Sequence, residues 1–269
     1  MTDRTQDILK RVKCFILDLD GTVYLGDKIL EGSMEFLEEL TKDNIKFKFF
    51  TNNSSKNSQF YVNKIRKMGY ELTDDMMLTS NQVIINYIKQ NMADRRIFVL
   101  GNEYLKADFR EAGINPDGDD AEVVVAGFDT SLVYENISRA CEFIRNGAVF
   151  LGVNPDFNCP TENGFIPDCG SICAMITAST GRVPEFFGKP SRHTLKYILE
   201  DTGFKEEEIA FVGDRLYTDI AIGKGNNSVT ILVLSGEAKL HDLDDSEIQP
   251  TLVFSSLGDV KDVLRQIYK

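Results

Sequence analysis

Short apolar runs alternate along this chain with segments of helical periodicity, and this alternation is the feature that most limits its possible folds. We expect strands at seven runs: 15–17, 45–50, 97–100, 123–126, 149–151, 209–212 and 229–234. Between them, apolar residues recur at helical spacing over 34–40, 60–68, 132–144, 194–199 and 260–267. Strands that alternate with helices are typical of a parallel sheet covered by helices, so the predicted fold class is α/β.

Length and charge limit the class of protein further. A chain of 269 residues with 42% hydrophobic content can form one large domain or two ordinary ones. No run approaches 18 uninterrupted apolar residues, and the polar opening lacks a signal-peptide core, so we expect no membrane partner and a cytoplasmic location. The net charge of −12, without a basic run, disfavours nucleic-acid binding.

The cysteines indicate packing residues rather than a disulfide framework. The chain has an odd number of them, and Cys14 and Cys141 lie in apolar segments, as reduced thiols do. Cys169 and Cys173 are spaced more widely than the usual zinc-binding pair, and both histidines are distant in sequence. We therefore expect no zinc site. The segment 115–120 reads as a polar, acidic loop.

The chain places two carboxylates directly after its first apolar run, in Asp18-Leu19-Asp20-Gly21-Thr22. Acids two residues apart on extended backbone project to the same side, and Gly21 permits a sharp turn that brings backbone amides close to an anion. Such a pair suits a metal ion, a nucleophile and an acid/base partner. A simple turn is the alternative; a calcium loop is excluded because Ile29 stands where its closing glutamate is required.

Four polar motifs follow predicted strands or precede a predicted helix: 18–22, 51–55, 188–191 and 213–219. Ligands of open parallel sheets bind beyond the carboxyl ends of the strands, so all four can meet at one edge. Taken singly, the second can be a helix cap, Lys189 a solvated lysine and Gly213-Asp214 a strand-ending turn. Their joint occurrence favours a binding site.

The parts required for a phosphoryl site are present in these motifs. Thr51 offers a hydroxyl group, the amides of Asn52 and Asn53 can line a helix N-terminus, and Lys189 can neutralise phosphate as a point charge. The predicted phosphate-binding residues are therefore Gly21, Thr51, Asn52, Asn53 and Lys189.

The acids provide the matching metal site. Magnesium prefers oxygen ligands and usually takes few protein carboxylates together with water and substrate phosphate. The predicted metal residues are Asp18, Asp20, Asp214 and Asp219, with Asp219 either a ligand or a neighbour of one. The predicted cofactor is Mg²⁺, with manganese and cobalt left open.

These motifs, in this order, resemble those of the haloacid dehalogenase superfamily. The narrower resemblance is to its subclass IIA, the NagD-like and p-nitrophenylphosphatase-like phosphatases. It spans roughly residues 13–235 and rests on these segments: Thr51-Asn52-Asn53-Ser54, Asn154-Pro155-Asp156, Pro160-Thr161-Glu162, Gly170-Ser171-Ile172, Gly188-Lys189-Pro190-Ser191 and Gly213-Asp214-Arg215-Leu216-Tyr217-Thr218-Asp219-Ile220.

The resemblance implies a Rossmann-like parallel-sheet core with an inserted α/β cap domain of the C2 type. The expected core consists of residues 1–80 and 182–269, and the expected cap of residues 81–181. A cap joined by two crossings can close over a substrate and open to release product.

The resemblance also implies a mechanism on the matching residues. Asp18 attacks phosphorus and becomes an aspartyl-phosphate, Asp20 protonates the leaving oxygen and later takes a proton from water, and Lys189 offsets charge on the transferring group. The implied enzyme is a phosphomonoester hydrolase. The alternatives are a phosphomutase or phosphotransferase, which keeps both acids, and a noncatalytic phosphate-binding regulatory module of the same fold.

Substrate choice is expected to lie in the cap. The candidate specificity residues, from a segment that resembles a family cap loop, are Asn154, Asp156, Cys159 and Pro160. Cys159 stands where some relatives that process pyridoxal phosphate carry histidine, which weakens that assignment. The expected partner is a small phosphorylated metabolite; sugar phosphates, nucleoside monophosphates and phosphoglycolate stay open, as does a homo-oligomer.

Overall fold

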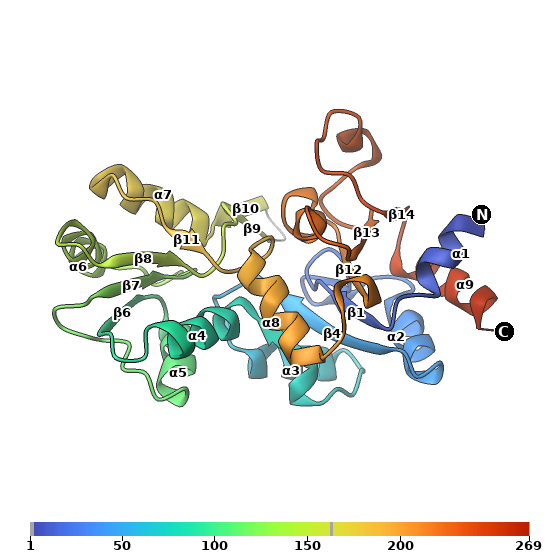
Figure 1. The fold of residues 1–269 in the computed structure, drawn as a ribbon, viewed down its shortest axis with the longest axis horizontal. Helices are drawn as coiled ribbons and strands as arrows, with labels where there is room; N and C mark the ends of the chain where they lie inside the picture. The colour runs from blue at the N-terminus through green and yellow to red at the C-terminus, as the bar shows by residue number, and fades with distance from the viewer. Residues whose placement is uncertain (1–2, 162–163, 269) are drawn as a thin grey trace. The chain divides into compact units, whose positions relative to one another are not determined.

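The computed structural model describes residues 3–161 and 164–268, so Glu162 of the quoted motifs lies outside the described residues. The chain forms two compact units. The first consists of Met1–Phe50, Val62–Leu78 and Leu195–Lys269, and the second of Thr51–Tyr61 and Thr79–Thr194. Each unit contains its own parallel sheet with helices (Figure 1).

The sheet built on the first unit positions the acidic motifs. Its strands lie in the order β14 (Leu252–Phe254), β13 (Val229–Val233), β12 (Ile209–Gly213), β1 (Cys14–Leu17), β4 (Lys46–Thr51) and β5 (Met77–Thr79). The pairs from β14 to β4 are all parallel. Every residue of β1, β12 and β13 is buried, which explains their continuous apolar runs.

Helices from both ends of the chain pack in the first unit. Helices α1 (Asp3–Leu9) and α9 (Leu257–Ile267) lie side by side, and α9 also packs on α2 (Ser33–Lys42) (Figure 1). The Arg265 Nε atom lies 2.6 Å from Oε2 of the buried Glu39 and ties α9 to α2. Helices α3 (Ser58–Lys67) and α8 (Arg192–Thr202) each begin in the second unit and continue into the first. A short hairpin, β2 (Tyr24–Leu25) and β3 (Lys28–Ile29), follows the Asp18 motif.

The second unit has a four-stranded parallel sheet in the order β11 (Glu185–Phe186), β8 (Val149–Gly152), β7 (Val123–Ala126) and β6 (Ile97–Leu100). Helices α4 (Ser80–Asn91) and α5 (Glu103–Glu111) cover one face, and α6 (Tyr134–Arg145) and α7 (Cys169–Thr180) cover the other (Figure 1). An antiparallel hairpin, β9 (Asn158–Thr161) and β10 (Gly164–Pro167), precedes α7.

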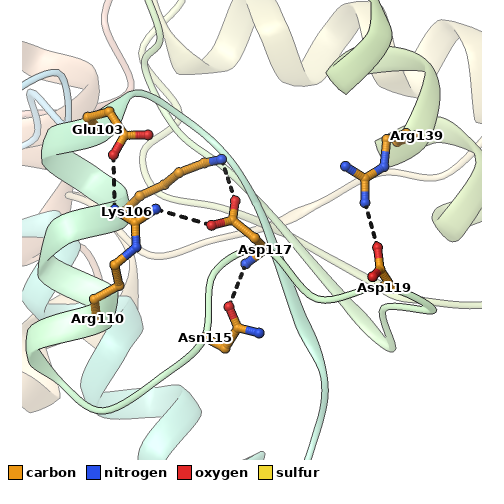
Figure 2. A network of polar contacts seen from close by, with 7 residues as sticks. All are labelled: Glu103, Lys106, Arg110, Asn115, Asp117, Asp119 and Arg139. Carbon is orange, nitrogen blue, oxygen red and sulfur yellow. Dashed lines mark hydrogen bonds and ion pairs between the residues drawn. The ribbon is translucent and has the colours of Figure 1, made fainter.

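The acidic loop 115–120 is held by cations from neighbouring helices (Figure 2). Asp117 accepts from Lys106 at 2.6 Å and from Arg110 at 3.1 Å, and Arg139 lies 3.1 Å from Asp119. The Asp117 amide donates to the Asn115 side chain. These pairs are at least partly exposed to solvent, so each contributes little stability and together they fix the path of the loop.

The predicted α/β class with a parallel-sheet core is confirmed, and each of the seven predicted runs forms a strand. The five predicted helices are observed as α2, α3, α6, α8 and α9. None of the five cysteines, all of which lie within the described residues, forms a disulfide, and Cys14, Cys141, Cys169 and Cys173 are buried as packing residues. Within 3–161 and 164–268, no helix has the length and apolar character needed to cross a bilayer.

Candidate active site

The first motif continues strand β1. The Asp18 amide donates to the Val212 carbonyl at 2.9 Å, so the backbone still follows the β12 ladder where the apolar run ends. Leu19 is fully buried, whereas Asp18 and Asp20 on either side of it are partly exposed. Such alternation of exposed and buried side chains is typical of extended backbone, and it places the two carboxyl groups on the side away from the core that Leu19 enters.

The turn that follows depends on glycine. Gly21 has a φ of +88°, and its amide donates to the Tyr24 carbonyl at 2.8 Å. The Ser235 hydroxyl donates to the Gly21 carbonyl at 2.8 Å. A Cβ atom on Gly21 would lie 2.3 Å from Oδ2 of Asp214. The turn therefore needs a residue without a side chain, both for its backbone conformation and for the space beside Asp214.

The last motif places two buried acids after β12. Asp214 follows the strand directly, and its Oδ2 accepts from the Glu237 amide at 2.6 Å. Asp219 lies in a helical turn, Leu216–Ile220, where its Oδ2 accepts from the Arg215 amide at 3.1 Å. A Cβ atom on Gly213 would lie 2.1 Å from Cγ of Asp219. Glycine thus makes room for the Asp219 carboxylate beside the end of the strand.

Three acids meet where β1 and β12 end. One carboxylate oxygen from each of Asp18, Asp214 and Asp219 lies within 4.8 Å of the others. Burial and the nearby Asp219 carboxylate raise the pKa of Asp214, and its buried Oδ1 accepts no hydrogen bond from the described residues. Close carboxylates with spare acceptor capacity fit a divalent cation, and a donor set made only of oxygen fits a hard one.

Asp20 is not a member of this three-acid group. Burial raises the pKa of its carboxyl group, and the nearby cations Lys64 and Arg215 act in the opposite direction. A raised pKa keeps more of the protonated form near neutral pH. Asp20 is therefore suited to donating a proton.

The second motif begins at the end of β4, which pairs with β1. Thr51 is 3% exposed, and its Oγ1 accepts from the Asn53 amide at 3.1 Å. The Asn53 side chain in turn accepts from the Ser55 amide and hydroxyl group, at 3.1 and 2.7 Å. Its Nδ2 lies 3.5 Å from Sγ of Cys159. These contacts close the segment into a compact turn rich in amide donors.

Lys189 lies in the second unit together with Asn52. Lys189 is only 3% exposed, and its backbone amide and carbonyl group are both hydrogen-bonded to the side chain of Asn52. The sequence predicted both residues for the site, through the backbone amide of Asn52 and the ammonium group of Lys189. The contact between them was not predicted.

The four candidate specificity residues fall into two pairs. Asn154 is fully buried and Asp156 is 2% exposed, and their side chains are hydrogen-bonded to each other. Cys159 and Pro160 lie in β9 and are partly exposed. Of the four, only the second pair is partly exposed to solvent.

Two further buried residues belong to this region: Ser54, which the sequence marked only as part of its motif, and Asp168, which was missed. The Ser54 hydroxyl donates to Asn154 at 3.1 Å and accepts from the Phe128 amide at 2.8 Å, and Asp168 accepts from Asn154 at 3.1 Å. The only available signal was that Asp168 precedes a helix, where aspartate is a common cap. Its side chain does accept from the Cys169 amide at the start of α7.

Two family models match this chain. One, described as haloacid dehalogenase-like hydrolase, matches residues 15–115, and the other, described as HAD-hydrolase-like, matches residues 186–260. The first covers the Asp18 and Thr51 motifs, and the second covers the Lys189 and Asp214 motifs.

Individual relatives match nearly the whole chain. An acid sugar phosphatase of Staphylococcus epidermidis is 34% identical over 251 residues, which is 93% of this chain and 97% of the relative. A solved 4-nitrophenylphosphatase of Thermotoga maritima is 44% identical, covers 95% of this chain and 98% of its own, and has a TM-score of 0.91. NagD of E. coli K-12 is 30% identical at a TM-score of 0.85, over 92% of this chain and 98% of its own. The resemblance to this superfamily and the predicted enzyme class, a phosphomonoester hydrolase, are confirmed, and the chain belongs to the haloacid dehalogenase-like hydrolases, among relatives of the NagD and p-nitrophenylphosphatase type.

Proposed function

We propose that this protein is a Mg²⁺-dependent phosphatase that hydrolyses small phosphate monoesters through a phosphorylated Asp18. The observation that carries the proposal is the group formed by Asp18, Asp214 and Asp219, with Asp20 beside it on the same strand extension. A binding protein for phosphate needs donors and cations, and it has no need for four acids at the site. A phosphoryl-transfer enzyme needs these donors and cations and also acids that act on the reacting atoms and hold a metal ion.

Asp18, Asp214 and Asp219 would hold the metal ion. Magnesium, when bound, would offset the negative charge on the transferring phosphoryl group. Two features of this chain support such a role: the spare acceptor capacity of Asp214 and the three glycines that leave room around the acids, Gly21, Gly213 and Gly236.

The side chains carry out the bond changes. A carboxylate oxygen of Asp18 attacks phosphorus, the bond from phosphorus to the ester oxygen breaks, and Asp20 gives its proton to that oxygen as the alcohol leaves. A water molecule then attacks the phosphorus of the phosphorylated Asp18. Its proton passes to Asp20, phosphate is released, and both carboxyl groups return to their starting states.

The remaining predicted residues bind the phosphoryl oxygens. Thr51 contributes its hydroxyl group, Asn52 contributes its backbone amide and Lys189 contributes a positive charge, and the Asn53 amide, which donates to Thr51 Oγ1, orients that hydroxyl group. We further propose that residues 81–181 act as a cap that excludes bulk water and selects the alcohol part of the substrate. Cys159 and Pro160, which keep exposed surface, are the candidates for contact with it.

The substrate class proposed first is the sugar phosphates, because curated relatives carry the name acid sugar phosphatase. A phosphomutase or phosphotransferase remains the alternative, since such enzymes also keep two acids. A cytoplasmic location is supported by five cysteines that form no disulfide within the described residues, which suits a reducing compartment.

The proposal is tested by the release of nitrophenol from p-nitrophenyl phosphate and by phosphate release from a panel of sugar phosphates. We expect turnover with magnesium, its loss with a chelator, and a fall in kcat of at least roughly 1,000-fold in Asp18→Asn, as for removal of a catalytic nucleophile. Asp262→Asn, a substitution of the same type on α9, serves as the control and should keep parent activity. Turnover that survives Asp18→Asn, or that ignores the chelator, would refute the proposal.

A further inference from the structure

The side chain of Asn52 holds the backbone of Lys189 at two points. The Lys189 amide donates to Asn52 Oδ1 at 2.7 Å, and Asn52 Nδ2 donates to the Lys189 carbonyl at 2.9 Å. The primary amide therefore pairs with Lys189 as a neighbouring strand would, with one donor and one acceptor. Asn52 lies 137 residues before Lys189 in the sequence.

Both donors of this side chain are used. An asparagine amide has two N–H donors, and the second donates to Oδ2 of Asp156 at 2.8 Å. Asn52 is 7% exposed, and its backbone carbonyl accepts from the Ser80 hydroxyl at 3.0 Å. The side chain thus has no donor left for a phosphate oxygen.

Gly188, which precedes Lys189, packs closely against the side-chain amide of Asn52. A Cβ atom on Gly188 would lie 2.6 Å from Asn52 Oδ1 and 2.8 Å from Cβ of Asn154. The Phe187 carbonyl accepts a hydrogen bond from the Thr194 hydroxyl. Lys189 therefore follows a segment with little freedom to shift.

A second layer of buried side chains fixes Asn52 in turn. Oδ2 of Asp156 accepts from Asn52 and, at 3.0 Å, from Asn154. Asn154 also donates to Asp168 and accepts from Ser54. All of these residues are at most 7% exposed. A buried polar network whose members are hydrogen-bonded to one another is rigid, because each rotation leaves polar groups unpaired.

We propose that Asn52 is a positioning residue that sets the place of Lys189, and that Asn154 and Asp156 serve to orient Asn52 rather than to contact substrate. The inference rests on the proposed function, in which Lys189 neutralises the transferring phosphoryl group. It moves two candidate specificity residues from substrate selection to support of the catalytic lysine. A cation displaced by about 1 Å can lose about 100-fold in rate, which is the scale of effect expected here.

The test is a double-mutant cycle on kcat with p-nitrophenyl phosphate, because a residue that acts through Lys189 loses its effect once Lys189 is gone. We expect Lys189→Ala to lower kcat by about 1,000-fold and Asn52→Ala by about 100-fold. The double variant should match Lys189→Ala within about threefold, since the two losses are not independent.

Asn81→Ala is the matched control. Asn81 is also a buried asparagine of the second unit, and its Nδ2 bridges the Lys56 carbonyl and the Asp108 carboxylate at 3.3 and 2.8 Å. Its removal should lower thermal stability about as much as Asn52→Ala while leaving kcat within about threefold of the parent, because it does not touch Lys189.

Hydrogen exchange gives a readout that does not depend on activity. The Lys189 amide should exchange faster in Asn52→Ala, which removes its acceptor, and at the parent rate in Asn81→Ala. If Lys189→Ala keeps parent activity, the proposed role of Lys189 fails. If Lys189→Ala is impaired but Asn52→Ala keeps parent kcat, or if the two losses multiply in the double variant, the positioning role is overturned while the proposed function stands.

Discussion

Replacement of Asp214 by asparagine should stabilise the metal-free protein and abolish its response to magnesium. The substitution keeps the size of the side chain and removes one negative charge from the group of Asp18, Asp214 and Asp219. A site built for a divalent cation stores repulsion when no cation is bound. Removing one carboxylate releases part of that repulsion and also removes a ligand.

The size of the effect follows from the geometry. Two unit charges 4.8 Å apart, the upper limit on the separation of the ligand oxygens, repel by about 3 kcal/mol at an effective dielectric constant of about 20. Against this gain, the hydrogen bond from the Glu237 amide to Asp214 loses its charged acceptor, which costs about 1 kcal/mol. We expect Asp214→Asn to raise the free energy of unfolding in chelator by about 2 kcal/mol at pH 8, where most carboxyl groups are ionised.

Urea unfolding with chelator measures the stability of the metal-free protein, and urea unfolding with saturating magnesium measures how much the metal ion stabilises it. Magnesium at about 100 times its dissociation constant should stabilise the parent by about 3 kcal/mol, since it binds only the folded protein. The same concentration should leave Asp214→Asn almost unchanged. If Asp214→Asn is less stable than the parent in chelator, or if magnesium stabilises both proteins equally, then these carboxylates do not form the cation site.

Two further substitutions test the surroundings of the site and the second unit. Gly21→Ala places a Cβ on a backbone with φ of +88° and 2.3 Å from Asp214, whereas the control Gly69→Ala has φ of +99° and open space around the Cβ. Both variants should lose about 1–2 kcal/mol of unfolding free energy because of the backbone conformation, and only Gly21→Ala should also lose its stabilisation by magnesium. Equal behaviour of the two variants would contradict the contact with Asp214. Burial raises the pKa of Asp108 to about 6, so its folded form binds a proton more tightly than the unfolded chain, and stability should fall as pH rises from about 4 to about 6 and then level off. Asp108→Asn should remove this fall in stability and should be more stable than the parent at pH 7 by about 1–2 kcal/mol, a value discounted because the carboxyl group is partly exposed. Urea unfolding across this pH range is the measurement, and profiles that run parallel in the parent and the variant would count against the raised pKa.

The central strands were predictable because their environment leaves a continuous signal. Strands β1, β12 and β13 are buried on both faces and are therefore apolar at nearly every position. The rule that ligands bind at the carboxyl ends of such strands was then enough to select Asp18 and Asp214, which the folded chain brings together.

Three kinds of missed element lack such a signal, although helices α4 and α5, which carry N-terminal caps and apolar faces, could have been predicted. Strands β9 and β10 contain Pro160 and Pro167 and are largely exposed, so their composition does not favour strands. Helix α7 is rich in small and apolar residues with no charged face, so it has no amphipathic pattern. Helix α1 is short and polar, and its place depends on contact with α9 from the far end of the chain.

The support around Lys189 could not be predicted for a different reason. Its hydrogen bonds join residues that are distant in sequence, as between Asn52 and Asp156, which are 104 positions apart. Buried asparagine and aspartate residues have no periodicity that identifies them, and in a loop they resemble ordinary turn residues. Only the folded chain reveals that Asn154 and Asp156 are buried and hydrogen-bonded to each other.

The most direct test of the proposed mechanism is the burst of nitrophenol in Asp20→Asn. Nitrophenolate leaves without protonation, so Asp18 can still be phosphorylated, but water attack then lacks its base. We expect one equivalent of nitrophenol per enzyme, followed by slow turnover, with phosphate on the peptide that contains Asp18. Steady turnover by Asp20→Asn without a burst and without phosphate on that peptide would contradict a phosphorylated Asp18 as the intermediate.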